Sequence, residues 1–396
     1  MMVEWLYQFA KGAGWFFVNP LFYFFVVMSL FYGHVRIKRE RKTFHTRVKD
    51  ITDELKFTYT KGIAAGLILS VLFCAVGIVL PFGLLMLIFI ITALFSFTFR
   101  MSALSSAYTL GITIIIGYGA AFFPEADRMI PQLPLTNWTG LAVLLGLLLL
   151  AEGLLSYRSA HVKMSPAIAI SKRGSYIGRQ IANRVWLLPL FLFIPGDGIS
   201  VPFDWWPVFS VNSQSFIPLW IPYFIGFGQR VQGSLPIISM QLTARRVCIL
   251  GIVTLAIGAA SYFWSPLSLA AAAVAVAGRA FLSWKQRVND NSAPYYFSKR
   301  NQGLMVLGII PHTPAEELNL EIGEIITKAN GIQVRKVTDF YEALEKNRTF
   351  IKLEIIDCDG QLRFEQRASY EGEHHELGIL FVKEDDEMEY RQYRNS

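Results

Sequence analysis

Long apolar runs separated by short polar segments dominate residues 1–284. A helix that crosses the hydrocarbon core of a bilayer needs about 20 apolar residues. The runs close to this length lie at 15–33, 62–80, 82–99, 103–123, 139–156, 185–201, 208–228, 247–264 and 266–283. Two pairs of neighbouring runs are divided only by Pro81-Phe82-Gly83 and by Ser265-Pro266, which permit tight helical hairpins. Residues 1–284 are therefore predicted to form a polytopic α-helical membrane domain of about nine spans.

The runs at 185–201 and 208–228 differ from the others because proline crowds them. The prolines in or beside these two runs are Pro189, Pro195, Pro202, Pro207, Pro218 and Pro222. Proline removes a helical hydrogen bond and clashes with the preceding turn. We therefore expect these two spans to be short, broken or re-entrant helices.

The pattern changes after residue 284. A polar stretch rich in Asn, Ser and Lys predicts a linker over 285–300, and alternating apolar positions predict an α+β domain over 301–383. The predicted elements of this domain include a helix opened by Thr338, a strand at 350–356, a turn at Asp359-Gly360 and a strand at 361–366. Residues 384–396 are predicted to form a charged, solvated tail.

Several positions of this domain resemble the motifs of bacterial PDZ domains: a glycine that opens a short strand, a Thr-Pro-Ala helix start, a Gly-Glu-Ile-Ile strand and an Asn-Gly turn. The motif residues are Gly303, Pro314, Ala315, Gly323, Asn330 and Gly331. The resemblance implies a small β-barrel that binds an extended peptide by strand addition beside its second helix. Phe340, Ala343 and Leu344, on one face of the helix that matches it, are candidate peptide-binding residues.

A second candidate for peptide binding lies near the end of the domain. PDZ domains usually hold a peptide carboxylate in an upstream hydrophobic-Gly-hydrophobic loop, and the segment from Tyr295 to Asn301 contains no such element. A matching element occurs downstream, at Leu377, Gly378, Ile379 and Leu380. Three alternatives stay open: the loop has moved to the C-terminal end, the domain binds an internal segment without a carboxylate site, or the element is a strand that completes the barrel.

Charge is divided unevenly along the chain. Residues 1–289 carry a net charge of +14 and residues 290–396 one of −7, so the overall +7 gives no argument for nucleic-acid binding. Basic residues mark the cytoplasmic side of a membrane protein, and segment 34–61 is rich in them. We therefore expect the C-terminal domain to be cytoplasmic. Five basic residues that directly follow a span are candidates for contact with anionic lipid, namely Arg36, Lys38, Arg39, Arg41 and Lys42.

The sequence predicts no catalytic residues, no metal and no cofactor. Cys74, Cys248 and Cys358 are widely spread and form neither a disulfide framework nor a metal cluster. Intramembrane proteases need catalytic histidines on membrane helices, and none of the six histidines lies in a predicted span. A protease relative that lacks catalytic motifs stays an alternative. A transporter is another, because Glu152 lies inside a span, although its place near Arg158 favours a structural ion pair.

The whole layout resembles the MinJ family of cell-division topology determinants. The resemblance rests on the polytopic region, the basic segment from Arg36 to Lys42, the segment from Phe57 to Gly62, and one C-terminal PDZ-type domain. It implies a non-enzymatic, membrane-anchored adaptor of the Min system in a Gram-positive bacterium, enriched at septa and poles. Its implied partners are a DivIVA-like coiled-coil protein and the MinD ATPase, so that division is restrained near poles.

Overall fold

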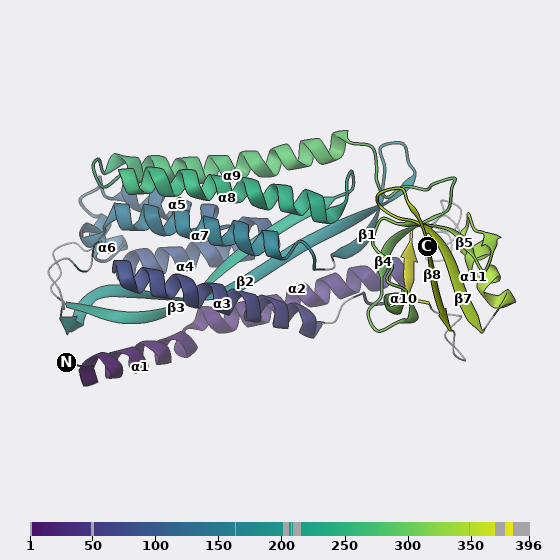
Figure 1. Cartoon of the computed structure of the whole chain (residues 1–396). Helices are drawn as coiled ribbons and strands as arrows, with labels where there is room; N and C mark the ends of the chain where they lie inside the picture. The colour runs from purple at the N-terminus through teal and green to yellow at the C-terminus, as the bar shows by residue number, and fades with distance from the viewer. Residues whose placement is uncertain are drawn as a thin grey trace.

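The computed structural model describes residues 2–48, 51–162, 164–200, 206, 208, 215–347, 349–368 and 377–382. The chain forms a long body, which ends at residue 292, and a smaller C-terminal domain that follows it along the same axis (Figure 1). The N-terminus lies at the end of the body that is farthest from the C-terminal domain. The tail predicted at 384–396 lies outside the described residues.

Helices form most of the body. They are α1 (Met2–Val18), α2 (Pro20–Phe44), α3 (Ile51–Val76), α4 (Phe82–Ser96), η1 (Met101–Leu104), α5 (Ser106–Ala120), α6 (Ala126–Met129), η2 (Leu133–Leu135), α7 (Trp138–Arg158), α8 (Pro236–Ala260) and α9 (Pro266–Ser292). Among the described residues, α2, the Tyr59–Val76 part of α3, α7, α8 and α9 are long and apolar enough to cross a membrane, whereas α4 and α5 are shorter. The chain is thus a membrane protein, and the number of its spans stays a prediction.

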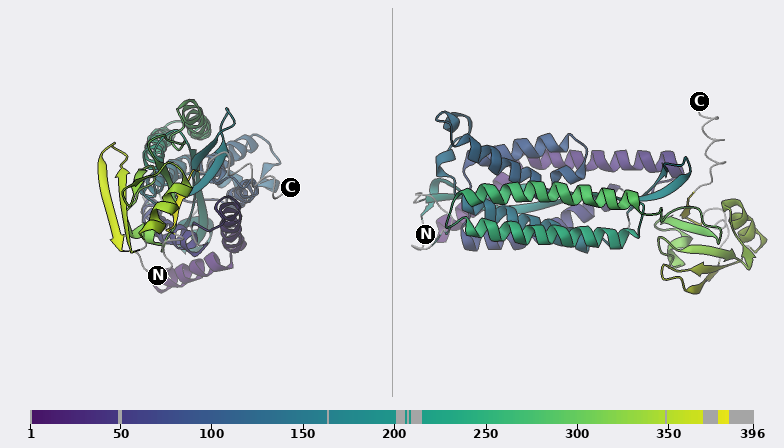
Figure 2. Two further views of the ribbon diagram at one scale, coloured as in Figure 1. Left: turned by 90° about the vertical axis from the view of Figure 1, so that its right-hand side faces the viewer. Right: turned by 90° about the horizontal axis from the view of Figure 1, so that it is seen from above.

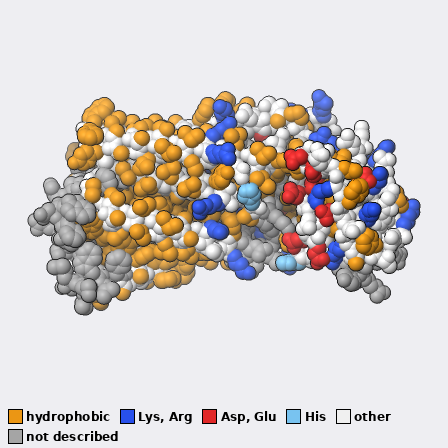
Figure 3. Space-filling view, in the orientation of Figure 1, with side chains coloured by type: hydrophobic (Ala, Val, Ile, Leu, Met, Phe, Trp, Pro, Cys, Tyr) orange, Lys and Arg blue, Asp and Glu red, His pale blue; other side chains and the backbone are white. Residues whose placement is uncertain are grey.

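The helix α7 is the centre of the body. Its most apolar stretch is 78% buried inside the protein, against 22% to 33% for the corresponding stretches of the other four long helices. Side chains such as Leu67, Ile90, Ile249 and Phe281 on the outer helices are exposed. Figure 3 shows hydrophobic side chains over most of the face of the body that it presents. Exposed apolar surface of this extent fits lipid as the solvent.

The first predicted span, 15–33, is interrupted. Helix α1 ends at Val18, and Asn19 caps a new helix, because its side chain accepts a hydrogen bond from Leu21 N at 3.0 Å while Pro20 occupies the first helical position. Helix α1 packs on the strand β3 (Ser215–Val231), where Gly12 meets the carbonyl of Pro218. Helix α1 therefore belongs to the body.

A long β-hairpin runs through the body. The strands β1 (Ser165–Ile170), β2 (Tyr176–Ser200) and β3 form an antiparallel sheet in the order β1-β2-β3. Helical spans at 185–201 and 208–228 are therefore a wrong prediction, because strands occupy residues 185–200 and 215–228. An interior helical proline costs about 3 kcal/mol. In the hairpin Pro189 lies opposite Pro222, and its backbone faces the outer edge, where Ser70 bonds its carbonyl, so it removes no hydrogen bond from the ladder.

Both faces of the hairpin are buried, and alternate residues face opposite layers. Trp186, Leu188 and Leu190 join the main core, which includes Leu110 of α5 and Leu148 of α7. Val185 and Leu187 face the other way, toward a cluster with Phe25 of α2. The ring of Phe25 stacks on that of Phe224, with centroids 3.6 Å apart. A strand buried on both faces reads as one continuous apolar run, so its hydropathy imitates a membrane helix.

The outer edge of β2 is covered by α3 and the segment after it. The side chain of Ser70 donates to the carbonyl of Pro189 at 2.8 Å and accepts from Phe191 N at 2.9 Å. Farther along, Leu80 N donates to Phe193 O at 2.7 Å. Gly66, one turn before Ser70, allows the close approach, because a Cβ there would lie 2.7 Å from Pro189 N. These contacts satisfy backbone groups that would otherwise be buried without partners.

The C-terminal domain holds a second sheet. Its elements are β4 (Leu304–Ile309), α10 (Pro314–Glu317), β5 (Ile325–Ala329), β6 (Ile332–Gln333), α11 (Val337–Lys346), β7 (Phe350–Ile356), β8 (Leu362–Ala368) and β9 (Ile379–Phe381). The strand order is β8-β7-β5-β4-β9, with β6 paired to β5. The predicted hairpin of β7 and β8 is confirmed. The expected closed barrel is not, because among the described strands β8 and β9 do not pair and the sheet stays open.

We predict that Gly66→Leu destabilises the body by about 1–3 kcal/mol, because the new side chain collides with the proline edge of β2. Gly14→Leu is the matched control, since nothing lies within 4 Å of a Cβ at Gly14. Thermal unfolding of the detergent-purified protein measures both. Equal melting temperatures for the two variants would contradict the close contact of α3 with the hairpin.

Candidate functional site

The motif residues of the C-terminal domain lie at turns and element starts. Pro314 and Ala315 open α10, and Gly323 adopts a positive φ of 104° just before β5. Asn330 and Gly331 form the turn from β5 to β6, both with positive φ. At Gly303, which precedes β4, a Cβ would collide with the backbone carbonyl of Ile326.

The side chain of Asn330 also joins two elements that frame the candidate site. Its amide group donates to the carbonyl of Ala343 in α11 at 3.2 Å, and its oxygen accepts from Lys352 N in β7 at 2.9 Å. Because a side chain other than Asn or Asp at this positive φ is strained, the residue type serves both the turn and the bridge.

The four residues predicted for a carboxylate loop lie together at one edge of the sheet. Leu377 O accepts from Ala315 N at 2.9 Å, and Gly378 O accepts from Ile310 N at 2.8 Å, so the element is held by α10 and by the end of β4. Gly378 has a φ of +86° and packs directly on the Thr313 side chain. Ile379 and Leu380 then begin β9, which pairs with β4.

The strand β9 has a free edge next to α11. In an antiparallel ladder the backbone groups of successive residues alternate between the two sides. Since Gly378 faces β4, the N–H and C=O of Ile379 and Phe381 face away from β4, and within the described residues no strand pairs with them. The rings of Phe381 and Phe340 of α11 contact edge to face, with centroids 5.3 Å apart. A strand edge and a helix therefore border the same side of the domain.

The predicted helix residues are more deeply buried than a peptide contact requires. Phe340, Ala343 and Leu344 are at most 1% exposed, and all three belong to the core of the C-terminal domain. They fix α11 against the sheet. The half-buried Val337 and Tyr341, one turn apart on the same helix, pack on the rim of this core. The apolar periodicity of the helix identified its inward face and missed these two.

The opposite face of β4 and β9 packs against the body. Leu380 and Leu307 join Phe44 and Val48 in one buried cluster. The side chain of Gln180 in β2 donates to Leu307 O at 2.5 Å. Gly178 N donates to Phe297 O at 2.8 Å in the connection between the two parts. Residues 285–292, placed in a linker from the sequence, continue α9, and only the remainder of 285–300 connects the domains.

Burial shifts the pKa values of polar groups near this connection. Burial and the neighbouring Cys358 raise the pKa of Tyr296 to about 12. Burial likewise raises the pKa of the Cys358 thiol, and nearby Glu324 and Glu321 raise it further. The hydrogen bonds from Arg363 to Glu324 raise the pKa of the guanidinium. The Tyr296 hydroxyl and the Cys358 thiol are thus neutral at neutral pH, while the ion pair of Arg363 with Glu324 lies within the C-terminal domain.

The five basic residues proposed to contact lipid divide into two groups. Arg36 lies 4.0 Å from Glu40, and Arg39 donates to the Ser165 hydroxyl at 2.7 Å, so both side chains form contacts within the body. Lys38, Arg41 and Lys42 are exposed. Figure 3 shows a band of Lys and Arg where the hydrophobic surface of the body ends. Lipid contact stays a prediction. Of the two groups, only Lys38, Arg41 and Lys42 are exposed enough to contact lipid.

Glu152 forms a buried ion pair with a residue that the sequence reasoning missed. The guanidinium of Arg279 in α9 donates to its carboxylate at 3.0 Å, and the two side chains are 2% and 0% exposed. The other carboxylate oxygen accepts from the Ser105 hydroxyl at 2.6 Å and from Ser106 N at 3.1 Å. The place of Glu152 near Arg158 predicted a structural pair without naming its partner, which is Arg279. The bonds tie α7, α9 and the start of α5 together.

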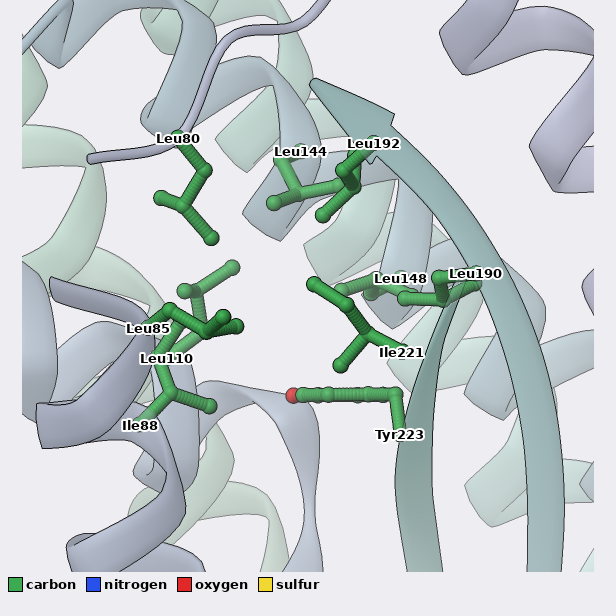
Figure 4. Close-up of a pocket in the computed structure, with 10 residues that line it drawn as sticks. All are labelled: Leu80, Leu85, Ile88, Leu110, Leu144, Leu148, Leu190, Leu192, Ile221 and Tyr223. Carbon is green, nitrogen blue, oxygen red and sulfur yellow. The ribbon is translucent and has the colours of Figure 1, made fainter. Parts of the chain in front are cut away.

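A small apolar cavity lies in the body between α4, α5, α7 and the hairpin (Figure 4). It is lined by Leu80, Leu85, Ile88, Leu110, Leu144, Leu148, Leu190, Leu192, Ile221 and Tyr223. The hydroxyl of Tyr223 is already bonded to Thr109 at 2.7 Å. A lining of this kind offers little to a polar solute. Among the described residues no group of three or more His, Cys, Asp or Glu is placed to hold a metal ion; His374 and His375 lie outside them.

Comparison with known proteins gives one full-length relative. The chain is 59% identical over 392 residues to the cell division topological determinant MinJ of Bacillus subtilis (strain 168), with 98% of each chain covered. It is 34% identical over 85 residues to the probable cell division topological determinants MinJ of Lacticaseibacillus paracasei and Lacticaseibacillus casei (strain BD-II), covering 22% of this chain and 23% of each relative. No protein-family model matches the chain. No solved structure matches it either.

We predict that Arg279→Met destabilises the body by about 3–5 kcal/mol, because it leaves the Glu152 carboxyl group buried without its counter-ion. The double variant Glu152→Gln/Arg279→Met is expected to regain much of this loss, since neither charge remains. Thermal unfolding in detergent measures the cycle. Strictly additive losses would contradict a direct ion pair.

Proposed function

The chain belongs to the family of MinJ cell division topological determinants, and from that premise we propose that it is a non-enzymatic, membrane-anchored adaptor in the selection of the division site. It gathers other division proteins at the inner face of the membrane. In this proposal one partner is a DivIVA-like coiled-coil protein at poles and septa, and another is the MinD ATPase. Bringing the two together restrains division near the poles.

The observation that carries the proposal is the free edge of β9 beside α11, on a domain fixed to a membrane body. We take this edge as the binding site of a PDZ-type module, in which an extended peptide adds a strand and side chains of the helix select its sequence. The loop formed by Leu377 and Gly378 precedes this strand, which supports a carboxylate site moved to the C-terminal end of the domain. Val337 and Tyr341 are the helix residues that we expect to meet the peptide.

Attachment to the membrane strengthens such an adaptor. The basic band at the end of the hydrophobic surface supports a cytoplasmic C-terminal domain, because Lys and Arg collect on that side of membrane proteins. Partners that bind near the membrane then meet the domain at a raised effective concentration, so that weak contacts suffice. A protease relative and a transporter are the alternatives; the buried pairing of Glu152 with Arg279 favours a structural role over a transport site.

We predict that Ile379→Pro abolishes capture of the peptide partner. Proline removes an N–H that faces the free edge, while the bonds of β9 to β4 stay intact. Co-purification of a DivIVA-like protein and MinD from membranes of a rod-shaped Gram-positive cell measures the effect. Glu342→Ala, on the exposed side of α11, is the control and should bind normally. If folded Ile379→Pro protein captured both partners as well as the unchanged protein does, the proposed peptide site between β9 and α11 would be contradicted.

We also predict that a fluorescent fusion of the whole chain collects at septa and poles in such a cell. Loss of the DivIVA-like protein should disperse it evenly over the membrane. A fusion that spreads evenly over the membrane although the DivIVA-like protein is present would count against the adaptor role as a whole. A localisation defect seen only in Ile379→Pro would concern only the peptide site between β9 and α11.

A further inference from the structure

The other edge of the C-terminal sheet, formed by β8, is also open. Its neighbour β7 pairs with it along the full strand, and within the described residues no strand pairs with its outer side. Phe364 and Leu362 are 57% and 54% exposed, which is unusual for large apolar side chains on a sheet. A long edge strand with exposed apolar residues is a template for pairing with another strand.

The free backbone groups of this edge belong to alternate residues. Lys352 of β7 turns its N–H and C=O toward Asn330, away from β8. Its partner across the ladder, Gln366, therefore turns its own backbone groups outward. By the same alternation Leu362, Phe364 and Ala368 also present their N–H and C=O on the free edge. An added strand would pair with residues of this set.

The charges along β8 favour one partner, a second copy of the same strand. Arg363, Glu365 and Arg367 alternate with the outward-facing residues, and within one copy Arg363 bonds Glu324 and Glu365 while Arg367 bonds Glu317. In an antiparallel pair centred on Phe364, Arg363 lies opposite Glu365 of the second copy, and Glu365 lies opposite its Arg363. A shift of the centre to Glu365 would place Glu365 opposite Glu365 and Arg363 opposite Arg367. Opposite charges across a ladder stabilise and like charges destabilise it, so the first register is preferred.

The orientation of the sheet permits such a pair within one membrane. The face of the sheet that carries Leu307 and Leu380 packs against the body. Ile325 belongs to this face, as do its ladder partners Ile356 and then Leu362. The two-fold axis of an antiparallel edge pair is perpendicular to the sheet at β8, so both bodies lie on the same side of the joined sheet.

The position of the hairpin fits this arrangement. Viewed along the long axis from the C-terminal domain, the yellow β7–β8 hairpin projects beside the helical body (Figure 2, left). The edge strand β8 can thus reach a second molecule before the bodies collide. Lys352, whose amino group lies 5.8 Å from the centre of the Phe364 ring, flanks the position of the axis.

We propose that two copies of this chain associate through β8, antiparallel and centred on Phe364. The pair uses the edge of the sheet opposite β9, so it does not depend on the proposed peptide groove. The interface is isologous, with Phe364 of one copy opposite Phe364 of the other and Leu362 opposite Gln366. Each dimer presents two copies of the β9 edge.

Site-specific disulfide formation tests the register in intact membranes. In a background with Cys74→Ala, Cys248→Ala and Cys358→Ala, Phe364→Cys is expected to give a cross-linked dimer on mild oxidation, because the two Cα atoms would lie about 5.5 Å apart. Gln366→Cys alone is the matched control and should not cross-link, because its copies would be four residues out of register. Two differently tagged chains, one Leu362→Cys and one Gln366→Cys, should cross-link to each other.

A charge-reversal variant distinguishes pairing of the two β8 strands from chance collision of two chains. Glu365→Arg, added to Phe364→Cys, places like charges opposite one another and should strongly reduce the cross-link. Thermal unfolding shows that each variant is folded. Absence of a dimer in folded Phe364→Cys protein overturns the proposal, and so does an equal yield from Gln366→Cys. Cross-linking that persists unchanged with Glu365→Arg would show contact without the proposed pairing and would overturn it as well.

Discussion

The fold of the body depends on one constraint: the backbone of a β-hairpin placed among apolar helices must find partners for every N–H and C=O along its edges. Lipid and apolar side chains offer none. Ser70, whose single hydroxyl serves both Pro189 and Phe191, and the chain at Leu80, which pairs with Phe193, supply such partners along the edge of β2. On the β3 side, Gly226 lets η1 approach the strand closely.

Backbones can approach this closely only where small residues lie between them. The helix pair α7–α8 shows the same arrangement. Gly146 and Gly153 of α7 each face α8, while Gly251 and Gly258 of α8 each face α7, so the two helices interlock along their length. The strand β2 begins beside the C-terminal domain and continues into the body. Gln180 near that end holds Leu307, so the position of the sheet is set by the strand that the helices enclose.

The sequence predicted the helices of the body and the order of elements in the C-terminal domain, because both show clear periodicity and turn residues. It could not reveal the hairpin, since a strand buried on both faces loses its alternation. Proline crowding was the only available signal. Arg279 was missed because its pairing with Glu152 joins residues that are 127 positions apart. On α11 the pattern located the buried face correctly, but periodicity gives no means to identify the residues at its rim that a proposed peptide would contact.

The two free edges of the C-terminal sheet differ in what they can recognise. Beside β9 stands α11, so an added strand would have its side chains read by a helix, and many sequences can be told apart. On the outer side of β8 no described strand pairs, and an added strand meets backbone groups, a few apolar side chains and the alternating charges of Arg363, Glu365 and Arg367. Such an edge discriminates poorly among foreign strands, but it matches a strand with the same charges in reverse order. Because the two partners are identical, their charges match, and this match provides the specificity that α11 would provide at the β9 edge.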